Sequence, residues 1–203
     1  MKPNTLLTII GITLVLIGSI GALTIQFQPV HKVYEKNKYR IGWMVLNDYS
    51  GKAGPVKKDQ TKKIPVEIIE HNNLTNVSFI IQVNDRYRLS KQNPANVHIV
   101  IKAPNGTTEI EDTIIANPEA ERGYVFVIAR VPNEIVVMAN DEAEALKKIS
   151  VYSSTNGTGN WTVEVSYTRN RPTYIMDDVI EVYIDAPYDY YIANITKITT
   201  GAV

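Results

Sequence analysis

Three histidines and one pair of adjacent aspartates are the residues most able to do chemistry in this chain. His31, His71 and His98 are far apart in the sequence, and none belongs to an HExxH or HxH pattern that would gather metal ligands. Asp177 and Asp178 are neighbours, but adjacent residues of a strand point to opposite faces, so without a bulge they cannot converge on one substrate atom. GxSxG, P-loop and GxGxxG patterns are absent from the sequence. We therefore predict a protein that is not an enzyme, with no catalytic residue, metal site or cofactor.

The composition narrows the class of protein further. The chain has 203 residues, of which 44% are apolar and 21% are charged, enough apolar residues for one well-packed domain. Its formal net charge is zero, which argues against nucleic acid as a partner because phosphate binding needs a basic surplus. It has no cysteine, so disulfides, thiolate metal sites and a thiol nucleophile are all excluded.

The neutral total conceals an uneven distribution of charge. Between His31 and Ile64 there are nine lysines and arginines against three acidic residues. Between Glu109 and Glu144 there are nine acidic residues against two arginines. Two interpretations remain open: a solvated surface without further meaning, or a head-to-tail contact between copies in which unlike ends attract.

The N-terminus predicts export. Residues 3–30 carry no charged side chain, and Lys2 precedes a dense apolar run from Thr5 to Ile17 that is followed by small residues. This is the layout of a secretory signal peptide, with cleavage after Gly21 or Ala22. The apolar stretch is also long enough to remain as a membrane anchor. The hydrophobic leader, residues 1–22, is therefore expected to be a helix that is either removed or retained.

Six N-x-S/T acceptor patterns favour an extracellular location for the rest of the chain. Chance predicts roughly two matches for this content of Asn, Ser and Thr. Glycan attachment needs exposed acceptors on an exported domain, and several of the six lie in turn-like sequence. The candidate glycosylation sites are Asn73, Asn76, Asn105, Asn156, Asn160 and Asn194.

Alternation of apolar and polar residues recurs along the body and predicts an antiparallel, Ig-like β-sandwich over residues 35–203. The clearest case places Trp161, Val163, Val165 and Tyr167 on one face. The other predicted strands are Gly42–Leu46, Val66–Ile69, Val77–Val83, Val97–Ile101, Tyr124–Val131, Glu134–Met138, Lys148–Tyr152 and Ile180–Ile184.

Two interruptions of the strand pattern are expected. A short helix is predicted after Asn140 as its cap, with acidic residues in its first turn and Lys147 and Lys148 in its last, which suits the helix dipole. The stretch from Asp48 to Lys63 is rich in Gly and Lys and is predicted to be a long exposed loop.

Taken together, the layout resembles archaeal cell-surface proteins, specifically subunits of thread-like or bundling-pilus filaments. The shared features are a signal-like leader, an alternating segment directly after it, and a cysteine-free, sequon-rich β-sandwich. The resemblance implies donor-strand complementation, in which the N-terminal tail of each subunit completes the sheet of the next. Here that tail would run from Ala22 to about Val33, and the extended segment of residues 23–34 is the candidate donor strand. Leu23, Ile25 and Phe27 are its expected donor-strand residues.

Two classes of function follow. The first is a self-assembling subunit of an extracellular filament, whose main partners are other copies of itself. The second is a membrane-anchored binding module that links membrane machinery to envelope proteins or glycans, with the leader retained in the membrane. The mature N-terminus separates the two, since cleavage near Ala22 favours the filament.

Overall fold

The computed structural model of this chain describes residues 36–87, 90–169 and 178–199, all of which belong to one compact unit, Lys36–Val203. The expected leader helix and the donor-strand residues Leu23, Ile25 and Phe27 lie outside the described residues. The elements, in chain order, are β1 (Asn37–Lys57), β2 (Lys62–Ile68), β3 (Leu74–Asp85), β4 (Ala95–Lys102), β5 (Thr108–Ala116), β6 (Glu119–Val127), β7 (Ile135–Ala139), α2 (Glu142–Lys148), the 3₁₀ helix η1 (Ser150–Tyr152), β8 (Gly159–Arg169) and β9 (Val179–Ile198).

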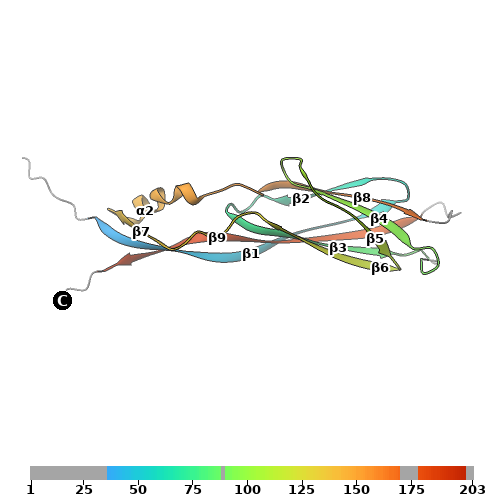
Figure 1. Cartoon of the computed structure of the whole chain (residues 1–203), viewed down its shortest axis with the longest axis horizontal. Coiled ribbons are helices and arrows are strands. Elements are labelled where there is room, and N and C mark those ends of the chain that lie inside the picture. Colours follow the sequence, from blue (N-terminus) through green and yellow to red (C-terminus); the bar gives the residue numbers. More distant parts are fainter. Residues whose placement is uncertain (1–35, 88–89, 170–177, 200–203) are drawn as a thin grey trace, which may run out of the picture. The chain divides into compact units, whose positions relative to one another are not determined.

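The strands form two antiparallel sheets, which confirms an all-β sandwich (Figure 1). One sheet has the order β6-β3-β9-β1-β7 and the other β2-β8-β4-β5. Without the short strand β7, the chain passes between two four-stranded sheets in the order of a jelly roll, with β1, β3, β6 and β9 in one and β2, β4, β5 and β8 in the other.

This strand order corrects the Ig-like topology expected from the sequence. In an Ig sandwich, several strands that follow one another in the chain are also neighbours in a sheet. Here β4 and β5 are the one such pair among the described strands, and the other connections between the eight jelly-roll strands all cross from one sheet to the other. Alternation reports which side chains point inward, but it does not report which strand lies beside which.

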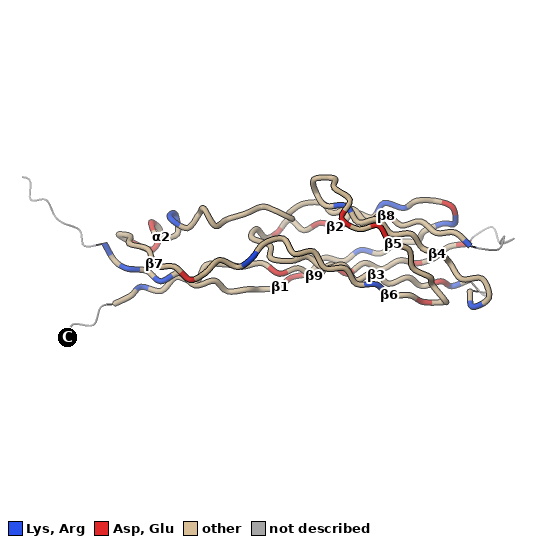
Figure 2. Tube along the Cα trace, viewed as in Figure 1, with Lys and Arg blue, Asp and Glu red and all other residues tan. Residues whose placement is uncertain are grey.

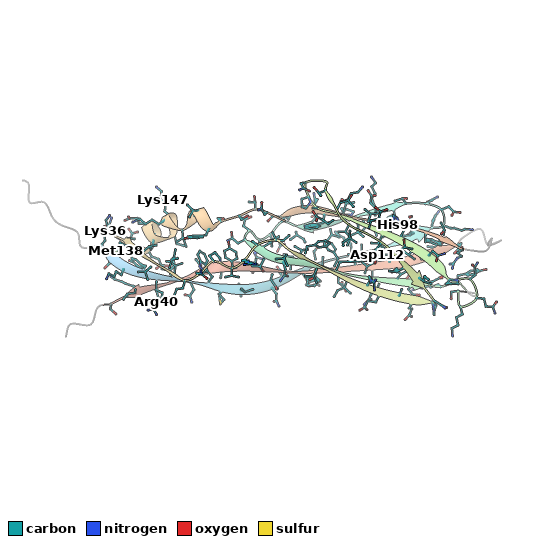
Figure 3. All side chains as sticks on the ribbon, viewed as in Figure 1. Lys36, Arg40, His98, Asp112, Met138 and Lys147 are labelled. Atoms are coloured by element: carbon teal, nitrogen blue, oxygen red, sulfur yellow. The ribbon has the colours of Figure 1, made fainter. Side chains whose placement is uncertain are left out.

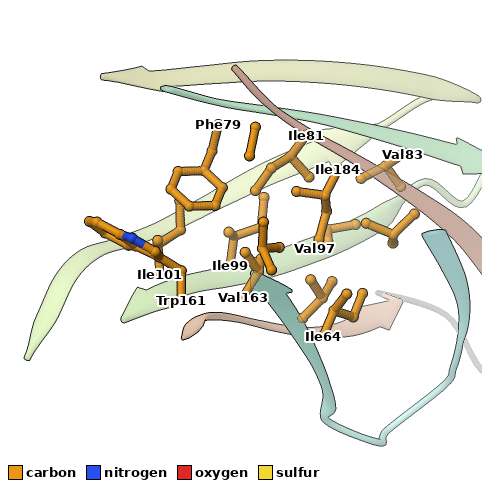
Figure 4. Packing of buried hydrophobic residues seen from close by; sticks show 14 of the residues in the cluster. Ile64, Phe79, Ile81, Val83, Val97, Ile99, Ile101, Trp161, Val163 and Ile184 are labelled. Atoms are coloured by element: carbon orange, nitrogen blue, oxygen red, sulfur yellow. The ribbon is translucent and has the colours of Figure 1, made fainter. Parts of the chain in front are cut away.

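The main core lies between the two sheets (Figure 4). Trp161, Val163, Val165 and Tyr167 are all buried, so the predicted register of β8 is confirmed. They pack against side chains of the other sheet such as Phe79. The inward residues of β2, β3, β4 and β9 alternate with outward ones in the same way, so each strand contributes every second side chain to the core.

Strands β1 and β9 are longer than any strand predicted. They pair from Lys38↔Ile198 to Lys57↔Val179, without interruption. The predicted loop over residues 48–63 is therefore wrong, because β1 continues through Gly51, Gly54 and Pro55 and only residues 58–61 connect it to β2. Glycine and proline indicated a loop, but pairing with β9 on one edge holds this segment extended.

Beyond the jelly roll, the ladder of β1 and β9 carries a second, smaller cluster, which we call the lobe. It is formed by the first residues of β1, the last residues of β9, and β7, α2 and η1. Its fully packed members are Tyr39, Ile41, Ala139, Ala145 and Ile149. The predicted strand Lys148–Tyr152 is instead the end of α2 followed by η1, and Ile149 contributes its side chain to the lobe.

The predicted helix exists, but Asp141 rather than Asn140 caps it. The Asp141 carboxylate accepts a hydrogen bond from the Glu144 N–H at 2.7 Å, and Glu144 accepts one from the Asn140 N–H at 3.0 Å. The arrangement differs from a capping box in that Glu144 accepts from the residue before the cap rather than from the cap itself. Among the described residues, no helix has the length and apolar character needed to cross a membrane.

Candidate interaction groove

An open groove of about 610 Å³ lies beside the end of β6. We call it the β6 groove. Its walls are the end of β6 with Ile128, the β4–β5 turn around Asn105, and the turn around Asn156 before β8. The three walls are far apart in the sequence, so the groove exists only once the two sheets have packed together.

The floor of the β6 groove is aromatic. The Trp161 ring centroid lies 5.3 Å from those of both Phe79 and Phe126, and the two phenylalanine rings meet edge to face at 5.8 Å. The Trp161 indole N–H donates to the Gly157 carbonyl at 2.8 Å, which fixes the ring. Gly157 has φ of +77°, and a Cβ there would lie 3.0 Å from Ile128, so this turn needs glycine. These rings form a packed apolar layer beneath the groove, in which Phe79 and Trp161 are buried and Phe126 is partly exposed.

Strand β6 borders this groove as an edge strand. It pairs with β3 on one side, and no strand of the described residues pairs with its other side. Its first half carries Glu119, Glu121 and Arg122, all exposed, which is the usual protection of an edge against unwanted pairing. Its second half lacks charge: Val125 is 68% and Val127 is 78% exposed. Exposed apolar residues on an open edge mark a site where another strand can add.

The acidic half of β6 is tied to the neighbouring edge strand β5. The Tyr124 hydroxyl donates to Asp112 at 2.9 Å, and the Arg122 guanidinium donates to the same carboxylate at 3.3 Å. Burial and then the bond to Asp112 raise the pKa of Tyr124 to about 12. The bonds from Tyr124 and from the Thr113 N–H hold the pKa of Asp112 below its ordinary value. This contact joins the two sheets at their edges.

Four of the six candidate glycosylation sites have exposed side chains. Asn105 and Asn156 lie in turns at the rim of the β6 groove, Asn160 is the second residue of β8, and Asn194 lies on β9. Asn105 uses its side-chain oxygen to accept from the Thr107 N–H, which stabilises its turn.

The other two asparagines are half-buried and hydrogen-bonded. The Asn73 amide donates to the Tyr191 carbonyl at 3.3 Å and accepts from the Ser154 N–H at 2.8 Å. The Asn76 amide donates to Asp189 at 2.8 Å. A glycan on either nitrogen would have to break these bonds, so we expect occupancy mainly at the four exposed positions.

His71 has close polar and aromatic neighbours, although it is isolated from the other histidines in the sequence. His71 lies 3.1 Å from Asp48, and its ring stacks on Tyr190 with centroids 3.8 Å apart. Asp48, Glu70 and His71 each offer one potential metal-ligand atom within 4.8 Å of the others. The Tyr49 N–H, and then His71, lower the pKa of Asp48. His98 is paired with Glu111 at 3.1 Å, and His31 lies outside the described residues.

A buried ion-pair network is the feature that the sequence did not predict. Arg169 on β8 is fully buried and donates to both Asp85 and Asp178 at 2.8 Å, with a further bond to the Asn93 carbonyl. Burial alone would lower the pKa of Arg169, but the two carboxylates outweigh it and raise that pKa. Tyr167 also donates to Asp178. Asp178, considered above as half of a carboxylate pair, is thus a structural partner, and Asp177 lies outside the described residues.

No family model and no curated protein matches this chain. Among solved structures, a chain of the Nora virus structure aligns with 80% of this chain and 64% of its own length, at 9% identity and a TM-score of 0.39. A chain of broad bean stain virus aligns with 79% of this chain and 92% of its own length, at 11% identity and a TM-score of 0.34. TM-scores this low carry no argument about this protein, and its topology is argued from its own strand order.

Proposed function

We propose that this protein is a non-enzymatic structural subunit that assembles into an extracellular filament by donor-strand complementation. In this proposal, Ala22–Val33 of one copy adds to β6 of the next. The observation that carries it is the second half of β6, where Val125 and Val127 are exposed on an open edge directly beside the β6 groove.

The chemistry of the groove suits an alternating apolar segment. An added strand would hydrogen-bond to the free main-chain groups of β6, while every second side chain enters the groove. Ile25 and Phe27 have this spacing, and each would contribute roughly 1.5–3 kcal/mol on full burial. Phe126, which is partly exposed in the lining of the groove, offers Phe27 the edge-to-face contact that aromatic rings prefer.

The sequons support a surface location for the domain. In this proposal, residues 1–22 direct export as a signal peptide, and glycans at the exposed asparagines surround the assembled filament. This arrangement agrees with the resemblance to archaeal surface filaments. Stability without disulfides then rests on the jelly-roll core and on contacts between copies.

The proposal is tested by Val127→Asp, with Val151→Asp as the matched control. Val127 and Val151 are 78% and 80% exposed, so neither change removes core packing. Electron microscopy and light scattering should show that Val127→Asp stays folded but no longer forms filaments, and the Ile25→Asp/Phe27→Asp variant should behave alike. Val151→Asp should assemble normally. Filaments of unchanged length from Val127→Asp would exclude the groove as the acceptor.

The second candidate is the membrane-anchored module. The outer face of the lobe favours it, since Met44 and Ile192 lie opposite each other there with half-exposed side chains, near the exposed Val136 and Met138. Such a face could bind an envelope protein. Mass spectrometry of the native N-terminus separates the two, because a retained Met1 supports the anchor and a start near Ala22 supports the filament.

A further inference from the structure

Two pairs of strands in the jelly roll carry opposite net charge; Figure 2 marks the charged residues along the trace. The basic side is formed by β1 and β2, over residues 51–68, where five lysines face two carboxylates and the net charge is +3. The acidic side is formed by β5 and β6, over residues 108–127, where five carboxylates face one arginine and the net charge is −4. The charged residues are Lys52, Lys57, Lys58, Lys62, Lys63, Asp59 and Glu67 on the basic side, and Glu109, Glu111, Asp112, Glu119, Glu121 and Arg122 on the acidic side.

Each side is one continuous surface because its two strands touch. Lys62 on β2 reaches across to β1, where its Cε lies 3.8 Å from the position that a Cβ on Gly54 would occupy. On the acidic side, Asp112 of β5 binds Tyr124 and Arg122 of β6. The sheet orders put β2 and β5 at the two ends of one sheet, and β6 at the end of the other sheet away from β1.

Both sides also present strand edges. Among the described residues, β2 pairs only with β8, β5 only with β4 and β6 only with β3, while β7 covers β1 only as far as Ile41. Lys62, Lys63, Glu119 and Glu121 are all exposed along these edges. Charges on edge strands usually prevent pairing. Here their segregation by sign prevents only the pairing of like sides.

The segregation of charge therefore selects one kind of contact. A symmetric dimer through either side would bring the same patch of two copies together, and like charges would repel. A contact between the basic side of one copy and the acidic side of another brings unlike charges together. Such a contact is heterologous, and it leaves one free side of each kind at the two ends of a pair, so further copies can add.

We propose that a second copy of this chain docks with its basic side on the acidic side of the first, around Lys62 and Lys63 of one copy and Glu119 and Glu121 of the other. This inference rests on the proposed self-assembly and names a contact within it. It is centred on Glu119 and Glu121 in the first half of β6, whereas the donor-strand contact is centred on Val125 and Val127 in the second half. The two contacts can therefore be removed one at a time.

Charge reversal tests the inference on the full-length protein. The Lys62→Glu/Lys63→Glu variant changes the basic side from +3 to −1, and the Glu119→Lys/Glu121→Lys variant changes the acidic side from −4 to 0. Analytical ultracentrifugation at low ionic strength should show association of the wild type, and at least a ~10-fold weaker association constant for each variant alone. An equimolar mixture of the two variants should regain association, because each supplies the side that the other lacks.

Salt and a matched control complete the experiment. Raising the salt from 0.1 M to 1 M shortens the screening length from ~10 Å to ~3 Å and should weaken wild-type association. The Lys38→Glu/Lys147→Glu variant changes the charge by the same amount on exposed residues of β1 and α2 in the lobe, and it should associate as the wild type does. The inference is overturned by a wild type that stays monomeric at low salt, or by a mixture that gains nothing over its components.

The outcomes that would exclude the donor-strand contact differ from those that would exclude the charged contact. If Ile25→Asp/Phe27→Asp abolishes assembly while both charge-reversed variants assemble normally, the donor strand stands and the charged contact is wrong. If the mixture of charge-reversed variants regains association and Ile25→Asp/Phe27→Asp has no effect, the charged contact stands and the donor strand is wrong.

Discussion

The jelly roll and the lobe are built on the same two strands, β1 and β9, but they differ in how much apolar structure packs against those strands. In the jelly roll, β1 and β9 face a second sheet across a core of large apolar side chains. The jelly roll also contains the buried ion pairs of Arg169 with Asp85 and Asp178. In the lobe, around the labelled Met138 and Lys147 in Figure 3, the same strands carry β7, α2 and η1, and five of the described residues form its buried cluster. Packing, rather than strand length or pairing, therefore determines where this protein is stable.

The two regions also differ in where apolar side chains remain exposed, and this bears on where a partner can bind. The lobe leaves apolar side chains exposed on its outer face, including Met44 and Ile192. The jelly roll exposes apolar side chains at several places, including Tyr49, Ile69 and Ile115, and at β6 the exposed Val125 and Val127 border a groove. A preformed groove loses little entropy when it binds a strand. This is why the jelly roll, and not the lobe, is proposed as the acceptor.

The largest expected effect is the loss of the jelly roll by a charge in its core. Val163 is fully buried between the sheets, so Val163→Asp places a lone carboxylate there at a cost of several kcal/mol. We expect no folded protein by circular dichroism. A folded Val163→Asp variant with the wild-type melting temperature would show that this part of the core is not sealed.

The second-largest effect is expected in the buried network of Arg169, Asp85 and Asp178. The loss of stability there should depend on how much charge each variant leaves unpaired. Arg169→Met leaves Asp85 and Asp178 buried without their cation, and should lower the free energy of unfolding by roughly 3–5 kcal/mol. Asp85→Asn leaves Arg169 paired with Asp178, so the loss should be smaller, roughly 1–3 kcal/mol. Urea unfolding measures both. The reverse order would mean that hydrogen bonds, not charge balance, dominate this site.

A matched pair of isoleucines compares the two regions directly. Ile41 in the lobe and Ile99 in the jelly roll are both fully buried. Each truncation to Ala removes roughly 2–5 kcal/mol of packing. Ile99→Ala should lower the global unfolding midpoint, whereas Ile41→Ala should mainly speed amide hydrogen exchange in β7 and α2. Equal shifts of the global midpoint would show that the lobe and the jelly roll unfold as one unit.

The smallest effect concerns the contact between β5 and β6 at high pH. The folded state raises the pKa of Tyr124 from 10.0 to about 12, through burial and then Asp112. It thus binds this proton more tightly than the unfolded state, and the stabilisation is present below pH 10 and is lost as pH rises towards 12. Melting temperatures should fall over this range, and Tyr124→Phe should reduce the fall. An identical decline in the variant would assign the effect to other tyrosines, such as Tyr188.

Much of the sandwich was predictable because alternation depends on local sequence. Trp161 to Tyr167 showed which face is buried, since burial on one face selects every second residue. The continuation of β1 through Gly54 and Pro55 was not predictable, because pairing with β9 overrides local propensity. β5 was missed because its exposed half is charged or polar and only Ile114 and Ala116 are buried.

The candidate sites were less predictable because they join distant parts of the chain. The partners in the Arg169 network are up to 84 residues apart, and a single buried arginine has no local signature. The β6 groove combines an edge strand with two turns, so its existence depends on the order of strands in the sheets. The segregation of charge was visible in the sequence, but its placement on opposite sides required the jelly-roll topology.

Disulfide trapping tests the central claim most directly, because the chain has no cysteine of its own. Two single-cysteine proteins, Gln28→Cys and Val127→Cys, are mixed under assembly conditions and oxidised. Gln28 is adjacent to Phe27, so it points to the outer face, where Val127 lies, when Phe27 faces Phe126. A disulfide needs Cα atoms ~4.4–6.8 Å apart, so only a donor segment lying on β6 can form it efficiently. We predict a mixed disulfide dimer between the two proteins, absent when Val151→Cys replaces Val127→Cys. Filaments that form without this cross-link, or equal cross-linking to both positions, would contradict donor-strand addition at β6.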